Sequence, residues 1–157
     1  MNLRELLPKG KISEETMQAL EPVFQGEILF KEERYEEAEA KYLAGLENFP
    51  PGSGGRFLVY NKLGILYEKM EKFARAKEVY GSAVQEGAST PFTFQRLAQL
   101  HLEGDRPEEA RRYCDLGIKA LKKANTNFFQ EIYFWFIFRK LKRDIKRRGS
   151  PASQPEK

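Results

Sequence analysis

Small residues and aromatic residues recur along this sequence at nearly constant spacing, and this recurrence restricts the fold more than any other feature. When Gly26, Gly64 and Ala98 are aligned, an alanine follows 12 residues after each of them. An aromatic residue or a cysteine comes four residues later, and a glycine or alanine three residues after that. These later positions are Ala38, Ala76 and Ala110, then Tyr42, Tyr80 and Cys114, and finally Gly45, Ala83 and Gly117. Self-similarity of this kind predicts a repeat architecture.

The spacing between copies also indicates what each copy is. The second and third copies are 34 residues apart, and the first and second are 38 apart. The longer spacing contains the segment 50–55, PPGSGG, and a loop insertion of this size costs little. Each copy reads as two amphipathic helices joined by a tight turn, with the small residues where the helices cross. We therefore expect an all-α protein, an α-solenoid of three helix pairs.

This pattern resembles the tetratricopeptide repeat (TPR). In the second copy seven residues occupy signature positions of that family, namely Tyr60, Leu63, Gly64, Tyr67, Ala76, Tyr80 and Ala83. Pro22 and Gln25 depart from the pattern in the first copy, and His101 and Cys114 replace aromatic residues in the third. The resemblance covers residues 19 to 123 and implies an interaction scaffold that is not an enzyme and holds no cofactor.

The predicted elements divide the chain into four parts. These are a flexible segment 1–12, a three-repeat TPR domain with an N-terminal helix at 13–123, a C-terminal helix packed on that domain at 124–148, and a disordered tail at 149–157. A helix near 13–21 is expected to end or kink at Pro22. The predicted helix pairs are 22–32 with 35–48, 57–70 with 73–86, and 91–103 with 106–122, followed by a final helix at 126–148.

The resemblance implies that the first helix of each pair lines a concave groove for a partner. The groove residues expected from the family spacing are Leu20, Val23, Glu27, Phe30, Leu58, Asn61, Ile65, Glu68, Phe92, Gln95, Arg96, Gln99 and Leu102. This lining suits a helix or an extended peptide, although each of these residues has packing against neighbouring helices as its alternative role. TPR domains that clamp chaperone tails have a lysine and an asparagine where this chain has Val23 and Glu27, so we reject that ligand.

Two apolar stripes run along the final helix. The first stripe is Phe128, Ile132 and Trp135, broadened by Phe129 and Phe136. The second stripe, about 150° away, is Phe134, Phe138, Leu141 and Ile145. One stripe can cover the last repeat, which leaves the other for a partner. We expect the first stripe to be structural and the second to be the interface, with a second protomer, the protein's own groove, another protein or a membrane surface.

Basic side chains gather at the end of this helix. They are Arg139, Lys140, Lys142, Arg143, Lys146, Arg147 and Arg148, against Asp144 alone. A solvated helix end with cations favoured by the helix dipole is one interpretation. Contact with anionic lipid or an acidic protein surface is the second. Nucleic acid is the third and is disfavoured, because no platform for base stacking accompanies the charges.

The sequence contains only one cysteine and one histidine, residues that often act in catalysis or bind metals, and they do not stand in known patterns. The single cysteine excludes an internal disulfide framework and fits a reducing compartment, so we expect a cytoplasmic protein. His101 and Cys114 stand where the family has packing aromatic residues, and neither has further ligands spaced for a metal. No nucleophile and base stand in a known catalytic pattern. We therefore predict no metal site and no catalytic residues.

Together these features predict an adaptor or assembly factor that holds a peptide or helix of another protein in its groove. The terminal helix would add self-association as a homodimer or tethering to a surface, an anionic membrane included. One alternative is a peripheral membrane or nucleic-acid binder that uses the basic helix. Another is a secretion-type chaperone, a class that three repeats in a chain of 157 residues resemble.

Overall fold

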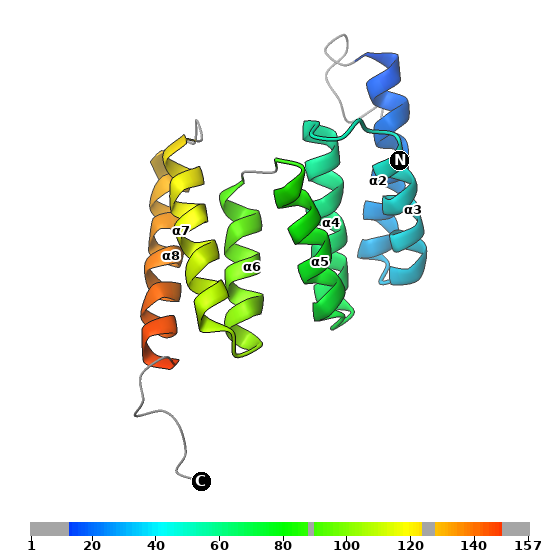
Figure 1. The fold of residues 1–157 in the computed structure, drawn as a ribbon. Coiled ribbons are helices and arrows are strands. Elements are labelled where there is room, and N and C mark those ends of the chain that lie inside the picture. The colour runs from blue at the N-terminus through cyan, green and yellow to red at the C-terminus, as the bar shows by residue number, and fades with distance from the viewer. Residues whose placement is uncertain (1–12, 88–89, 124–127, 149–157) are drawn as a thin grey trace. The chain divides into compact units, whose positions relative to one another are not determined.

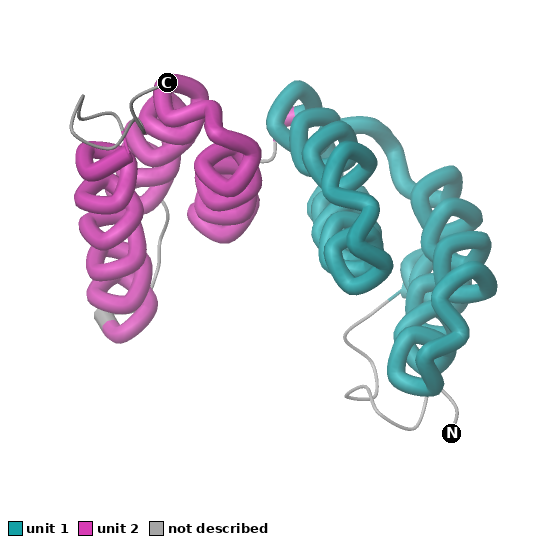
Figure 2. The backbone as a smooth tube through the Cα atoms, turned by 90° about the horizontal axis from the view of Figure 1, so that it is seen from below, with its two compact units in different colours: residues 1–86 teal, residues 87–157 magenta. Residues whose placement is uncertain are grey.

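The computed structural model describes residues 13–87, 90–123 and 128–148. Over these residues the chain forms seven α-helices and no strand, which confirms the predicted all-α class (Figure 1). The predicted flexible segment 1–12 and tail 149–157 lie outside the described residues. The helices group into two compact units, residues 1–86 and 87–157, which Figure 2 draws in different colours. The grouping of residues 13–123 into one three-repeat domain stays a prediction.

Two helix pairs form unit 1. α2 (Glu14–Lys31) packs against α3 (Tyr35–Glu47), and α4 (Gly54–Lys69) packs against α5 (Phe73–Gln85). In the first pair the ring of Tyr42 lies 2.7 Å from where a Cβ on Gly26 would stand, and in the second pair Tyr80 meets Gly64 in the same way. Glycine lets the two backbones approach, and the tyrosine fills the remaining space. The small and aromatic residues of the repeat therefore meet at the helix crossings, as predicted.

Three helices form unit 2. α6 (Pro91–Glu103) pairs with α7 (Pro107–Lys123), and α8 (Phe128–Arg148) contacts both of them. Ala98 and Ala110 are fully buried where α6 and α7 cross, at the positions that the repeat reserves for small residues. The third helix pair and the long terminal helix are thus present.

The same turn joins the two helices of every pair. It contains a residue in the left-handed region, and these residues are Glu33, Glu71 and Asp105, with φ of 61°, 56° and 55°. In the first turn the N–H groups of Glu33 and Arg34 donate to the carbonyls of Phe30 and Leu29 at 3.1 and 2.9 Å. The other two turns repeat both bonds. Because glycine is the usual residue at such a helix end, the sequence holds no obvious signal for these turns.

The N-terminal helix differs from the prediction. Instead of ending near Pro22, α2 runs without a break from Glu14 to Lys31. A proline inside a helix costs about 3 kcal/mol because it removes a hydrogen bond and clashes with the preceding turn. Here Val23 and Pro22 lie 2.6 and 3.8 Å from where a Cβ on Gly45 of α3 would stand, and this close packing offsets the cost. The predicted start is confirmed, since Ser13 Oγ accepts the N–H of Thr16 at 3.2 Å.

The inserted segment before α4 is anchored by side chains. α4 begins at Gly54, earlier than the predicted residue 57, because Ser53 Oγ accepts the N–H of Arg56 at 3.3 Å and caps the helix. Arg56 Nε donates to Glu86 at 2.6 Å, and its Nη1 donates to two backbone carbonyls before the insert at 3.0 and 3.3 Å. The hydroxyl of Tyr60 donates to the same carboxylate at 2.7 Å. These bonds, with one from the N–H of Gly52 to Glu86 at 3.5 Å, hold the insertion and the chain on both sides of it against the end of α5.

Candidate partner-binding surfaces

The first helices of unit 1, α2 and α4, contact each other through charged and aromatic side chains. Lys62 Nζ of α4 lies 2.7 Å from Glu27 Oε2 of α2, and the hydroxyl of Tyr42 donates to the same oxygen at 3.0 Å. Burial raises the pKa of Glu27, but the hydrogen bond and charge of Lys62 outweigh burial, so the pKa is lowered. Glu27 is therefore ionised at neutral pH and links three helices of unit 1.

The predicted groove residues of unit 1 differ in exposure. Val23 is buried, and the Glu68 carboxylate accepts the Tyr80 hydroxyl at 2.8 Å, so both support the fold. Leu58 is 40% exposed. The half-buried members are Leu20, Phe30, Asn61 and Ile65. Apart from Glu27 and Glu68, whose carboxylates are bonded within the unit, these five are the predicted groove residues of α2 and α4 that remain accessible to a partner, and their role in binding stays a prediction.

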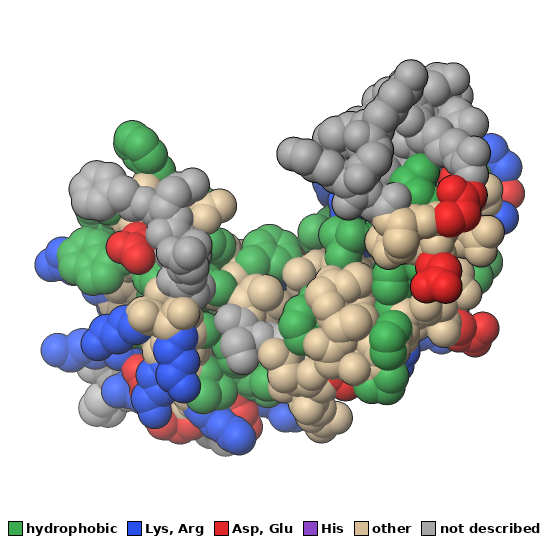
Figure 3. Space-filling view, turned by 90° about the horizontal axis from the view of Figure 1, so that it is seen from above, with side chains coloured by type: hydrophobic (Ala, Val, Ile, Leu, Met, Phe, Trp, Pro, Cys, Tyr) green, Lys and Arg blue, Asp and Glu red, His purple; other side chains and the backbone are tan. Residues whose placement is uncertain are grey.

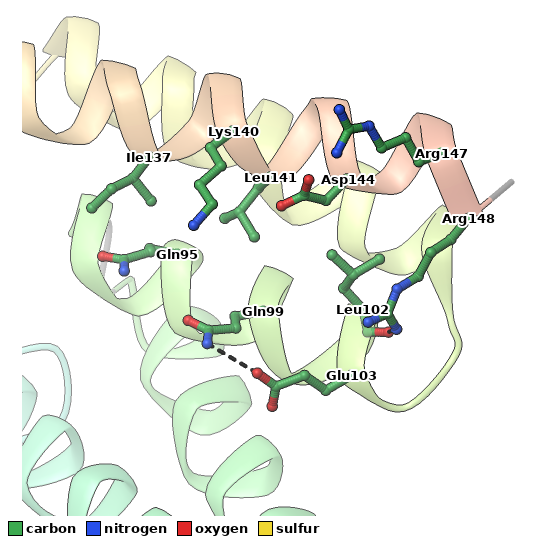
Figure 4. Close-up of a pocket in the computed structure, with 10 residues that line it drawn as sticks. All are labelled: Gln95, Gln99, Leu102, Glu103, Ile137, Lys140, Leu141, Asp144, Arg147 and Arg148. Atoms are coloured by element: carbon green, nitrogen blue, oxygen red, sulfur yellow. Dashed lines mark hydrogen bonds between the residues drawn. The ribbon is translucent and has the colours of Figure 1, made fainter.

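A pocket of about 490 Å³, the α6–α8 pocket, lies within unit 2 (Figure 4). Its α6 wall holds three predicted groove residues, Gln95, Gln99 and Leu102, together with Glu103. Its α8 wall is Ile137, Lys140, Leu141, Asp144, Arg147 and Arg148. Phe92 and Arg96 are half-buried on α6 and do not line the pocket. Ile137, Asp144 and Glu103 were missing from the predicted site because the prediction placed the groove on the repeats alone.

Hydrogen bonds orient the polar groups of this pocket. Arg96 donates to Gln99 Oε1 at 2.9 Å, and Gln99 Nε2 donates to Glu103 at 2.9 Å (Figure 4). Burial lowers the pKa of the Arg96 guanidinium. On the opposite wall, Arg148 donates to the carbonyl of Leu102 at 2.6 Å and fastens the end of α8 to α6. The α6–α8 pocket thus combines oriented amides, leucine side chains and charges of both signs.

The structure reverses the orientation predicted for the terminal helix. The second stripe, expected to face a partner, packs inside unit 2: Phe138 and Ile145 are 1% exposed, Leu141 is 9% exposed, and Phe134 is half-buried. The prediction that these side chains face solvent or a partner, while the first stripe packs on the last repeat, is wrong. The physical reason is Gly117 of α7, which leaves a space that the ring of Phe138 fills.

The outward side of α8 carries five large apolar side chains, which we call the aromatic face. They are Phe129, Ile132, Tyr133, Trp135 and Phe136, with exposures of 81, 39, 59, 48 and 61%. Ile132, Trp135 and Phe136 border an apolar depression of about 470 Å³ with Leu121 of α7. In Figure 3, hydrophobic and basic side chains lie next to each other at the α7–α8 end of the drawn surface. The first stripe is therefore exposed, although the side chain of Phe128 lies outside the description.

The basic residues of α8 fall into two groups. Those of the first group contact other side chains or the backbone of unit 2. Lys142 Nζ lies 2.7 Å from Asp115 Oδ1, the Arg139 guanidinium lies 5.0 Å from the centroid of the Trp135 ring, and Arg148 donates to the carbonyl of Leu102 in α6. The second group is exposed on the carboxyl-terminal half of the helix and consists of Lys140, Arg143, Lys146 and Arg147. This half of α8 is therefore strongly cationic.

The residues most often used in catalysis are packed into unit 2. Cys114 is fully buried, and burial raises the pKa of its thiol to about 12, so it is not a thiolate at neutral pH. His101 is half-buried and stacks on Tyr113 with ring centroids 5.3 Å apart. Within the described ranges, no three His, Cys, Asp or Glu side chains gather where they could hold a metal ion. No helix in the same ranges is long and apolar enough to cross a membrane.

Comparison with known proteins identifies the repeat. The family model described as tetratricopeptide repeat matches residues 58–85, which lie within the second helix pair. No curated protein matches the sequence.

Solved structures share the fold. The Yersinia enterocolitica type III secretion chaperone SycD, in complex with a peptide of the translocator YopD, is 18% identical with a TM-score of 0.68, over 90% of this chain and 100% of that chain. The TPR2B domain of yeast Sti1, in its pHsp70 complex, is 14% identical with a TM-score of 0.67, over 84% and 98%. The Sgt2 TPR domain from Aspergillus fumigatus is 15% identical with a TM-score of 0.67, over 89% and 87%.

Sequence identities this low establish that the fold is shared, but they do not show that this chain binds the same ligands. The matched repeat coincides with α4 and α5, where Gly64 and Tyr80 make the contact that the repeat pattern predicts. The chain therefore contains a tetratricopeptide repeat at residues 58–85 and shares the fold of solved TPR domains.

Proposed function

We propose that this protein is an adaptor that binds a peptide or helix of another protein along the first helices of its repeats. The α6–α8 pocket carries the proposal, because three groove residues expected from the family spacing line it. A concave site with a few oriented polar groups is the usual form of a binding site. The SycD and Sti1 structures support the proposal, since each holds a partner in the same fold.

The lining of the α6–α8 pocket indicates the chemistry of the ligand. The amides of Gln95 and Gln99 can pair with the N–H and C=O groups of a peptide backbone. Leu102 and Leu141 offer contact to an apolar side chain. Three basic side chains line the pocket against two carboxylates, which favours an acidic group on the ligand.

A secretion-type chaperone is a narrower form of the same proposal. The alignment with SycD covers all of that chain and 90% of this one, which supports this form at the level of architecture. Ligands with several apolar anchors inside an extended segment would favour it. Ligands that need a free carboxyl terminus would oppose it.

Selection of peptides from a random displayed library tests the proposal. We expect the wild-type protein to enrich peptides with an apolar anchor and an acidic neighbour. Gln95→Ala with Gln99→Ala should weaken the best peptide about thirty-fold, since each of the two lost hydrogen bonds contributes about 1 kcal/mol. Fluorescence anisotropy with the labelled peptide measures the dissociation constant.

The matched control is Gln85→Ala, which removes an exposed amide at the end of α5. It should bind the peptide as the wild type does. If the selected peptides bind the Gln95 and Gln99 double variant with unchanged affinity, the α6–α8 pocket is not the site. If no peptide is enriched at all, the adaptor proposal itself is contradicted.

A further inference from the structure

The outward side of α8 changes from aromatic to basic along one continuous line. Phe129, Ile132, Tyr133 and Phe136 follow the spacing of a single helix face, and Lys140, Arg143 and Arg147 continue it. From this arrangement we infer a second function, separate from peptide binding: α8 docks unit 2 onto an anionic phospholipid membrane. The aromatic face enters the interfacial layer of the bilayer, and the basic half contacts the lipid phosphates.

The composition of the aromatic face fits that layer. Tyrosine and tryptophan are favoured at the boundary between headgroups and acyl chains, because their rings are apolar and carry one polar group. Phe129 and Phe136 are exposed at 81 and 61%, so both rings stand in water while no bilayer is present. Burying exposed side chains of this size provides the apolar part of the binding free energy.

The charges beyond the aromatic face have the sign that an anionic leaflet requires. Arg143 and Lys146 are exposed, and neither side chain makes an ion pair with a described residue. Lys122 of α7 lines the apolar depression together with one carboxylate, Glu131, so the excess of positive charge lies on the carboxyl-terminal half of α8. Clusters of basic side chains next to apolar anchors are attracted by the negative surface potential of such a leaflet.

The two chemistries are separated along the helix by a distance that matches a bilayer surface. Arg143 comes seven residues after Phe136, a rise of about 10 Å along the helix at 1.5 Å per residue. The polar layer on each side of the hydrocarbon is about 5–8 Å deep. A helix that is inclined to the surface therefore places its aromatic end below the phosphates while its basic end remains among them.

Two other occupants fit this arrangement less well. A second copy of the chain would bring the same excess of positive charge to the interface, whereas the lipid phosphates bring the opposite sign. A single-stranded nucleic acid alternates bases with phosphates, so its binding surfaces interleave aromatic and basic side chains. On α8 all of the aromatic residues precede all of the basic ones.

The single tryptophan of the chain, Trp135, lies on the aromatic face and reports directly on docking. The purified full chain is mixed with vesicles of phosphatidylcholine alone, or with about one third phosphatidylserine. We expect flotation with the anionic vesicles only, a blue shift of the Trp135 emission, and quenching by brominated acyl chains. Raising the salt from about 0.1 M to about 0.5 M should weaken the binding.

Two double variants separate the two parts of the surface, with folding checked by circular dichroism. Phe129→Ser with Phe136→Ser should lower the vesicle partition coefficient at least ten-fold, and Arg143→Ser with Lys146→Ser by a similar factor. The control for the apolar change is Leu43→Ser with Phe73→Ser, which are exposed at 43 and 48% in unit 1. The control for charge is Lys41→Ser with Lys69→Ser, also in unit 1. Both controls should bind as the wild type does.

Several results would overturn the inference. Absence of flotation with anionic vesicles, or an unchanged Trp135 spectrum in the bound state, would do so whatever the variants show. A wild-type dimer in sedimentation that Phe129→Ser with Phe136→Ser dissociates would assign the face to a second copy. Equal affinity for a single-stranded oligonucleotide, lost in the same variant, would assign it to nucleic acid. None of these results depends on peptide binding at the α6–α8 pocket.

Discussion

The ring of Phe138 in α8 occupies the space beside Gly117 in α7 that any larger side chain would need. Gly117 is therefore a glycine for reasons of packing. This contact attaches the terminal helix to the third repeat and sets which face of α8 turns inward. The peptide proposal and the membrane proposal both depend on it, because one uses the pocket beside α8 and the other uses its outer face.

A pair of glycine substitutions tests this contact. Gly117→Ala should lower the free energy of unfolding by about 1–3 kcal/mol, since the methyl group collides with the Phe138 ring. Gly81→Ala should raise it by about 0.4–1 kcal/mol, because this helical position has open space and alanine restricts the unfolded chain. Urea denaturation measures both. Stabilisation by both substitutions would mean that α8 does not pack on α7 in this way.

Truncation of one aromatic residue from each stripe tests the orientation of α8. Phe138→Ala should cost about 3–5 kcal/mol, because a fully buried ring is removed and a cavity remains. Trp135→Ala should cost about 1 kcal/mol or less, since the ring is half exposed and loses little beyond its contact with Arg139. Thermal melting by circular dichroism gives the comparison. The reverse order of the two effects would restore the orientation that the sequence alone suggested.

The inward face of α8 was in fact encoded in the sequence, in a register that helix periodicity alone does not reveal. Two stripes about 150° apart satisfy the 3.6-residue period equally well, so periodicity could not choose between them. Aligning α8 with α4 and α6, the first helices of the second and third pairs, does distinguish the two stripes. Tyr60 and Leu63 are buried in α4, Phe94 and Leu97 in α6, and Phe138 and Leu141 in α8, each pair three residues apart. The terminal helix thus repeats the packing of a first helix.

Other features of the fold differ in how far the sequence predicts them. The helix pairs followed from small residues at fixed spacing, because those residues determine how closely two helices can approach. The continuous α2 did not, since a proline normally ends a helix and only its packing against Gly45 explains the exception. The α6–α8 pocket also could not be predicted, because it depends on the placement of α8 relative to α6.

The cluster of Arg56, Tyr60 and Glu86 predicts a pH dependence in unit 1. The hydrogen bond from Tyr60 lowers the pKa of Glu86, and the bond from Arg56 lowers it further. A lowered pKa means stability that is present above the usual carboxyl pKa of 4.5 and is lost as the pH falls through the native value. Glu86→Gln should therefore cost about 1 kcal/mol at neutral pH and progressively less below about pH 4.5. Urea denaturation across this range measures the difference, and a cost independent of pH would contradict the ionised pairing.

Cys114 predicts the opposite dependence in unit 2. Burial raises the pKa of its thiol from 9.0 to about 12, so the folded chain keeps this proton at pH values where the unfolded chain releases it. The unfolded state then binds fewer protons, and the free energy of unfolding falls as the pH rises from about 9 toward 12. The Cys114→Ala variant has no thiol to titrate in the folded or the unfolded state. The buried tyrosines contribute equally to the pH dependence of the wild type and of the variant, so their contribution cancels in the comparison. The stability advantage of the wild type over the variant should therefore shrink by about 1–2 kcal/mol between about pH 8 and about pH 10. An advantage that stays constant over this range, or rapid reaction of the native thiol with a disulfide reagent, would show that the Cys114 side chain reaches solvent.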